Sequence, residues 1–179
     1  MAGHGAPHGT ENKGVALLIA VLALFLAVAE TAAKSAQTDA LSYNIEAANL
    51  WAFFQARTIR QTTVRTAVEA AALTPGEGTA AQVQRWNQTA ARWESEPETG
   101  EGRRELMTRA RAAEAKRDRS MERYHMFEYA SASFQVGIVV ASASIITGVA
   151  LLLWGGVGLG VLGVALGALG FLAPGMIHL

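Results

Sequence analysis

Two uncharged apolar blocks enclose a middle section that carries almost every charge of the chain. The first block is GVALLIAVLALFLAVA, residues 14–29, and the second runs from Tyr129 to Leu179 without an Asp, Glu, Lys or Arg. A helix needs about 20 apolar residues to cross the hydrocarbon core of a bilayer. Extended to residue 33, the first block reaches that length, and the second block can hold two spans. The pattern therefore predicts three transmembrane helices, with a polar insert between the first and the second.

Apolar spacing predicts that the insert is helical. Residues 34–73 contain neither Pro nor Gly, and apolar side chains recur every three or four residues from Tyr43 to Val68, with a gap near Arg57. This spacing is typical of one face of an amphipathic helix. Nothing breaks the helix between the first span and this segment, so one helix is expected from about residue 14 to residue 73. The sequence TPGEG, residues 74–78, ends it.

The remaining elements follow from the same signals. Thr79 is a plausible N-cap for a short helix, and the acidic turn SEPETGEG separates that helix from a charged one. The second span should then end at a tight turn, Gly155-Gly156. The predicted fold is all-α: an integral membrane protein with three transmembrane helices and an α-helical hairpin or coiled-coil insert. Its expected parts are a flexible tail (1–13), the first span (14–33), the insert (34–131, with helices 34–73, 79–94 and 103–131), the second span (132–154) and a glycine-rich third span (155–175).

Glycines of the last span fall on one helical stripe. Their spacing alternates between four and three residues, which places Gly156, Gly160, Gly163, Gly167 and Gly170 on one face. In lipid, helices associate through close backbone contact and packing, so such a stripe predicts a helix-packing surface. Its partner is either the preceding span, which includes Gly148 and other small residues, or the same helix of a second copy. We expect homo-oligomerisation through this stripe.

Several side chains fit the border between hydrocarbon and water. Tyr124, Tyr129 and Trp154 lie near predicted span ends, where aromatic residues are enriched. Glu30 stands four residues before Lys34, an order that favours an ion pair on a helix. We expect an interfacial pair there. The alternative is that Glu30 carries ions or protons within the membrane.

Aromatic side chains mark a candidate docking surface on the insert. Trp51, Phe53 and Phe54 crowd one turn and cannot all face one neighbouring helix, so at least one of them is expected to contact a partner. The alternative is that the short helix, through its two tryptophans, covers them. These residues are Trp51, Phe53, Phe54, Trp86 and Trp93.

Composition excludes several classes of function. The chain has 15 basic and 15 acidic residues and no cysteine, so nothing favours nucleic-acid binding, and thiol chemistry is excluded. His4 and His8 lie in the expected tail, where metal binding by two histidines is improbable. No Ser/His/Asp set or carboxylate pair points to an enzyme, and no cofactor or metal is expected. Ala27-Val28-Ala29 also fits a signal-peptidase site, but a retained first span is the favoured interpretation.

Four stretches carry a resemblance: the first span, ALSYNIEAANLWAFFQARTIRQT (40–62), RWNQTAARWESEPETGEGRREL (85–106) and YHMFEYASASFQVGIVVASASIITG (124–148). In these stretches the chain resembles a bacterial membrane-protein family described only as a domain of unknown function. The resemblance implies a bacterial inner-membrane protein with three spans and a helical insert. It implies no activity, cofactor or catalytic residue.

The sequence thus predicts a non-enzymatic membrane protein, either a self-associating scaffold or an accessory subunit of a membrane complex. The alternative is a channel or transport component that uses Glu30. Expected partners are the lipid bilayer, further copies or other membrane subunits, and anionic headgroups near the membrane end of the charged helix 103–123. Basic residues flank the insert, whereas Lys13 alone flanks the other side. The insert is therefore expected in the cytoplasm and the N-terminus outside.

Overall fold

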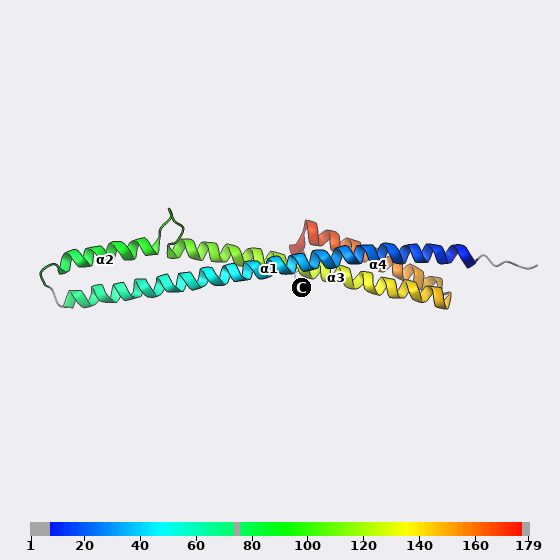
Figure 1. Cartoon of the computed structure of the whole chain (residues 1–179), viewed down its shortest axis with the longest axis horizontal. Coiled ribbons are helices and arrows are strands. Elements are labelled where there is room, and N and C mark those ends of the chain that lie inside the picture. Colours follow the sequence, from blue (N-terminus) through cyan, green and yellow to red (C-terminus); the bar gives the residue numbers. More distant parts are fainter. Residues whose placement is uncertain (1–7, 74–75, 177–179) are drawn as a thin grey trace, which may run out of the picture. The chain divides into compact units, whose positions relative to one another are not determined.

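The computed structural model describes residues 8–73 and 76–176. Within them the chain is all-α, without a strand, as the sequence predicts. The helices in chain order are α1 (His8–Leu73), α2 (Thr79–Glu94), α3 (Arg103–Thr147) and α4 (Ala150–Leu172), followed by the 3₁₀ turn η1 (Pro174–Met176) (Figure 1). Three of them, α1, α3 and α4, are long and apolar enough to cross a membrane.

One buried stripe runs along most of α1. Its positions alternate four and three residues apart, the spacing of a coiled-coil seam. Beyond the stretch that the sequence predicts, it extends back to Leu22, and Arg57, only 8 % exposed, fills the gap among the apolar residues. The buried and half-buried residues of this seam are Leu22, Leu26, Ala29, Ala33, Ala36, Ala40, Tyr43, Ala47, Leu50, Phe54, Arg57, Gln61, Val64 and Val68.

The chain divides into two compact units, and α1 and α3 each contribute to both. The apolar unit comprises the described residues up to Ala40 together with those from Asp118 onward, and the polar unit comprises Leu41–Arg117. In the apolar unit, α1, α3 and α4 pack around a core of Leu22, Ala29, Ala130 and Phe134. In the polar unit, α1 packs on α3 through Ala47, Leu50, Leu106, Ala110 and Ala113.

The start of α1 differs from the prediction. The helix begins at His8 and not near residue 14, so the part of the expected flexible tail that the structure describes is helical. Residues 1–7, with His4, lie outside the described residues. The other end of α1, at Leu73, and both ends of α2 agree with the sequence-based bounds. Gly78, with φ of 86°, is the N-cap of α2, and Thr79, the expected cap, is its first residue.

The predicted turn at Gly155-Gly156 is wrong. The helix break lies earlier, at Gly148-Val149, and both of those glycines stand inside α4 together with Trp154. Gly148 has φ of 70°, in the left-handed region that glycine adopts without strain. Its N–H donates to the carbonyl oxygen of Ser144 at 2.9 Å, which closes the end of α3.

Candidate functional site

The glycine stripe of α4 packs against α1 and α3 of the same chain. A Cβ atom added to Gly160 would lie 2.6 Å from Cδ2 of Leu22 in α1, and one added to Gly163 would lie 2.7 Å from Cε1 of Phe134 in α3. Both distances are shorter than van der Waals contact between carbon atoms. Glycine therefore lets α4 approach its two neighbours this closely without displacing either side chain.

The other glycines of the stripe also pack against α3. A Cβ atom on Gly156 would lie 3.0 Å from Cβ of Ala141, and one on Gly170 would lie 2.9 Å from Cε1 of Phe127. Gly167 packs more loosely, because a Cβ atom added to it would lie 3.9 Å from Cβ of Ala130. Gly148 belongs to the turn, and nothing lies within 4 Å of its Cβ position. Of the two occupants considered for the stripe, the geometry favours the chain's own helices.

A polar groove lies in the apolar unit between α1 and α3. Its volume is about 420 Å³, and we call it the border groove. Oε1 of Glu30 accepts a hydrogen bond from Nε2 of Gln135 at 3.2 Å. The hydroxyl of Tyr124 donates to Oε1 of Glu128, whose Oε2 lies 3.6 Å from Nδ1 of His125. The residues that line the groove are Glu30, Ala33, Lys34, Gln37, Tyr124, Glu128, Ser131, Ala132 and Gln135.

Local spacing misidentified the partner of Glu30. The ion pair with Lys34, expected from their four-residue separation, is absent from the ion pairs of the residues that the structure describes. Glu30 instead contacts Gln135, which lies on α3. Of the aromatic residues predicted at the membrane border, Tyr129 is 43 % exposed and Trp154 71 % exposed, whereas Tyr124 is half-buried and packs against the cluster that contains Phe127.

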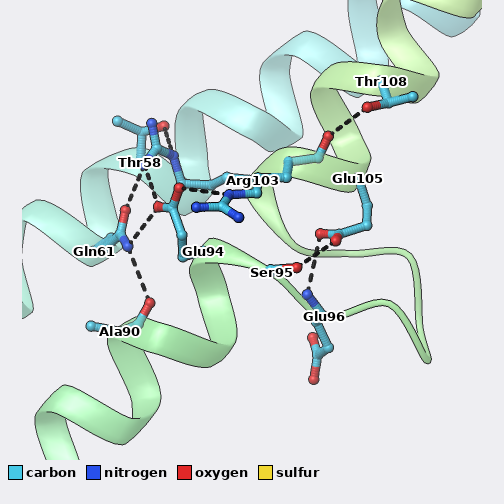
Figure 2. Close-up of polar contacts among 10 residues, drawn as sticks. Thr58, Gln61, Ala90, Glu94, Ser95, Glu96, Arg103, Glu105 and Thr108 are labelled. Atoms are coloured by element: carbon cyan, nitrogen blue, oxygen red, sulfur yellow. Dashed lines mark hydrogen bonds and ion pairs between the residues drawn. The ribbon is translucent and has the colours of Figure 1, made fainter.

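The polar unit is held by a partly buried network that we call the polar clamp (Figure 2). Gln61 of α1, only 2 % exposed, donates through Nε2 to the carbonyl of Ala90 and to Oε2 of Glu94, both in α2, at 3.1 and 3.0 Å. Arg103, the first residue of α3, donates to Gln61 at 2.7 Å and to Glu94 at 2.8 Å. Its Nε donates to the hydroxyl of Thr58 at 3.0 Å. One arginine therefore ties α1, α2 and α3 together.

A second carboxylate fixes the loop between α2 and α3. Glu105 accepts a hydrogen bond from the hydroxyl of Ser95 at 2.6 Å and another from the backbone N–H of Glu96 at 3.2 Å. Both bonds are accepted by one carboxylate, which holds the two residues that follow α2 against the first turn of α3. A Cβ atom on Gly102 would collide with Glu105 and with the backbone of Ser95 and Glu96. The loop can close this tightly only because glycine stands there.

The hydrogen bonds of both networks shift titration. The bond from Gln61, together with the charges of Arg103 and Arg104, lowers the pKa of Glu94 below its usual 4.5. The bond from the Ser95 hydroxyl lowers the pKa of Glu105 in the same direction. Because each bond favours the ionised carboxylate, both networks are strongest near neutral pH.

The candidate docking aromatics are largely used within the polar unit. Trp51, Phe53 and Phe54 pack against its core, and the indole N–H of Trp51 donates to Oε1 of Glu114 at 2.9 Å. Arg57 lies over the Phe53 ring and Arg103 over the Phe54 ring, with guanidinium carbons 5.3 and 5.1 Å from the ring centroids. The tryptophans of α2, Trp86 and Trp93, are half-buried. Of the partners of the first three side chains, Arg57 belongs to α1, whereas Glu114 and Arg103 belong to α3, so these three side chains take part in contacts within the polar unit.

The described residues contain no cluster of metal-ligating side chains. Within residues 8–73 and 76–176, no three His, Asp or Glu side chains gather closely enough to hold one metal ion. Polar residues converge in the border groove, in the polar clamp and around the loop between α2 and α3, where Glu105 binds Ser95 and Arg57 pairs with Glu101.

Comparison with known proteins gives one match. A family model described as Domain of unknown function (DUF4337) matches residues 11–173. No curated protein and no solved structure matches the chain.

Proposed function

Since the chain belongs to this family, DUF4337, whose description states no activity, we propose its role from the fold: a non-enzymatic, self-associating scaffold of the bacterial inner membrane. The three apolar helices of the apolar unit would be the spans. The polar unit would be the part that meets partners in water, either further copies or other subunits of a membrane complex.

Basic residues support one orientation. Lys34, Lys116 and Arg123 are among the cations that flank the polar insert, and Lys13 alone flanks the opposite end of the first span. Positively charged flanks stay on the cytoplasmic side of bacterial membranes. The insert and the C-terminus would lie in the cytoplasm and the N-terminus outside. A C-terminal reporter that is active only outside the cytoplasm would contradict this orientation.

The observation that carries self-association is an uncharged face of α1, which we call the outer face. Leu41, Ile45 and Ile59 are 60, 61 and 67 % exposed on it. Its positions alternate four and three residues apart, so they can form a second coiled-coil seam on the side away from the buried one. The exposed residues of the outer face are Leu41, Ile45, Ala48, Ala52, Gln55, Ile59, Thr62 and Thr66.

Membrane insertion makes a second copy of the chain a suitable partner. Two copies inserted in the same direction present their α1 helices in parallel, so in a two-fold pair each residue of the outer face meets its own equivalent. Such a pair brings no two equal charges together, because the outer face has no charged residue between positions 41 and 66. This replaces the glycine stripe, which α1 and α3 already cover, as the self-association surface.

Site-specific cross-linking tests the proposal. The chain has no native cysteine, so single Ile45→Cys and Ile59→Cys variants can be oxidised in native membranes. We expect cross-linked dimers from both. Glu46→Cys and Arg60→Cys, exposed next to them but off the outer face, are the matched controls and should cross-link at least about fivefold less. Monomers in all four variants, or equal cross-linking in all four, would refute self-association through this face.

The transport alternative has weaker support. Glu30 accepts a hydrogen bond from Gln135 at the rim of the apolar unit, and no ionisable side chain occurs in residues 129–176 other than Tyr129. A continuous path for ions would have to be lined by groups that the helices beyond this rim do not supply. Ion flux into liposomes that is lost in Glu30→Gln would restore this alternative.

A further inference from the structure

We propose that the border groove binds a zwitterionic lipid headgroup of the phosphoethanolamine class. The inference rests on the membrane insertion proposed above and adds a ligand to it. It stands on the position of the groove, on its charges and on its dimensions.

The position of the groove matches the headgroup layer. Glu30 is the first charged residue after the uncharged run 14–29 of α1, and Glu128 is the last one before the uncharged end of the chain. These two residues lie 98 positions apart in the sequence (128 − 30), yet both line the same groove. Two independent segments thus pass from uncharged to charged residues at the same level, which is where phospholipid headgroups lie.

The charges of the groove complement both ends of the headgroup. Two carboxylates, Glu30 and Glu128, can accept N–H bonds from a primary ammonium group. Lys34 lines the same groove, and its ammonium has no ion pair or hydrogen bond within the described part of the chain, so it is available for a phosphate. A quaternary ammonium has no N–H to donate and is recognised by several aromatic rings. The groove offers only Tyr124. A primary amine therefore fits better than choline.

Each carboxylate of the groove is held in place by a hydrogen bond to a neighbouring side chain. Tyr124 holds Oε1 of Glu128 through its hydroxyl, and Gln135 holds Oε1 of Glu30. Along α1 the groove extends from Glu30 to Gln37, which is about 10 Å at 1.5 Å per residue. This length accommodates an ammonium group and a phosphate in line. Val139, one helical turn from Gln135 toward the uncharged end of α3 and 67 % exposed, offers apolar surface to an acyl chain.

Lipid retention tests the site. The full chain would be purified with an equimolar mixture of phosphatidylethanolamine, phosphatidylcholine and phosphatidylglycerol carrying the same acyl chains, and bound lipid measured by native mass spectrometry. We expect at least about tenfold preference for phosphatidylethanolamine over each of the other two lipids. This preference should fall roughly fivefold in Glu128→Gln and in Lys34→Gln. Asp39→Asn, on α1 just beyond the groove, should retain the preference. If Glu128→Gln fails to fold, Tyr124→Phe serves in its place.

The outcomes separate this inference from the proposed function. Equal retention of the three lipids, or the same loss in Asp39→Asn, overturns the headgroup site while leaving membrane insertion intact. Displacement of the lipid by millimolar soluble O-phosphoethanolamine as effectively as by vesicles overturns the lipid assignment in favour of a soluble ligand. A chain that is absent from the membrane fraction overturns the proposed function itself.

Discussion

Gly163 of α4 faces the ring of Phe134 in α3, so closely that an added Cβ atom would lie 2.7 to 2.9 Å from three atoms of that ring. Phe134 also stacks on Phe25 of α1, with ring centroids 5.8 Å apart. The ring therefore contacts both α1 and Gly163 of α4. Contact between α3 and α4 at this point depends on the absence of a side chain.

Substitution of this glycine should separate the helices. We expect Gly163→Ala to destabilise the protein by about 1–3 kcal/mol, the usual cost of overpacking a well-packed core. Thermal unfolding in detergent measures the change. Gly158→Ala, on the same helix with nothing within 4 Å of its Cβ position, is the matched control and should be neutral or slightly stabilising. A Phe134→Leu substitution should recover part of the loss in Gly163→Ala, and simple additivity would contradict direct contact.

Substitution of Gly102, in the loop between α2 and α3, should destabilise the protein as much as substitution of Gly163. Gly102→Ala places a methyl group 2.7 Å from Cα of Ser95, and backbone atoms cannot yield as a side chain can. We expect a loss of about 1–3 kcal/mol in unfolding free energy. Gly76→Ala, whose Cβ would lie at an ordinary 3.4 Å from Oγ1 of Thr79, is the control. Equal stability of the two variants would mean that the loop opens in solution.

The polar clamp predicts a specific cost for removing its amide. Gln61→Leu keeps the volume of the side chain but deprives Arg103 and Glu94 of a buried partner. Unsatisfied buried groups cost about 1–3 kcal/mol each, so a loss of that size is expected in chemical unfolding of the full chain. Gln84→Leu, on the exposed side of α2, should change little. A Gln61→Leu variant as stable as the wild type would show that the clamp contributes only specificity of packing.

Acid should weaken the polar unit. The pKa values of Glu94 and Glu105 are lowered in the folded chain, so their contribution is complete above the unfolded value near 4.5 and is lost as the pH falls through the folded values. The unfolding temperature should therefore be nearly constant from pH 7 to 6 and decline below about pH 4.5. In Glu94→Gln this decline should be shallower than in the control Glu46→Gln, an exposed residue of α1. Identical slopes in both variants would exclude Glu94 as a contributor.

The seam of α1 was predictable because the local rule and the tertiary contact agree. Apolar residues spaced from Tyr43 to Val68 indicated a helix face, and the same face is the buried one. Gly148 and Gly156 show where this agreement fails. A glycine in an apolar helix serves equally well as a turn or as a point of close packing, because both need the absence of Cβ. Gly156 is a packing residue because Ala141 of α3 lies against it, whereas nothing approaches Gly148, which forms the turn. The local sequence around the two glycines does not distinguish these cases.

The polar contacts were less predictable for a similar reason. Arg103 stands at the start of a segment of alternating charge, which is typical of a solvated flank. Its partner Gln61 is 42 positions away, and the two meet because the chain reverses direction between α1 and α2, and α3 continues in the direction of α2 (Figure 1). A signal was present in Gln61 itself, a polar residue at an apolar position of the seam. For Glu30, the nearby Lys34 satisfied the local rule, while Gln135, 105 positions away, is the residue that it contacts.

The continuous seam from Leu22 to Val68 restricts how this polypeptide can change in length. One inserted residue would rotate every later position of α1 by about 100°, turning Leu50 or Gln61 from the interior toward solvent. An insertion of seven residues would restore the phase. Gains and losses of residues within this helix should thus come in whole heptads, whereas the non-helical loop before Gly102 has no helical phase to preserve.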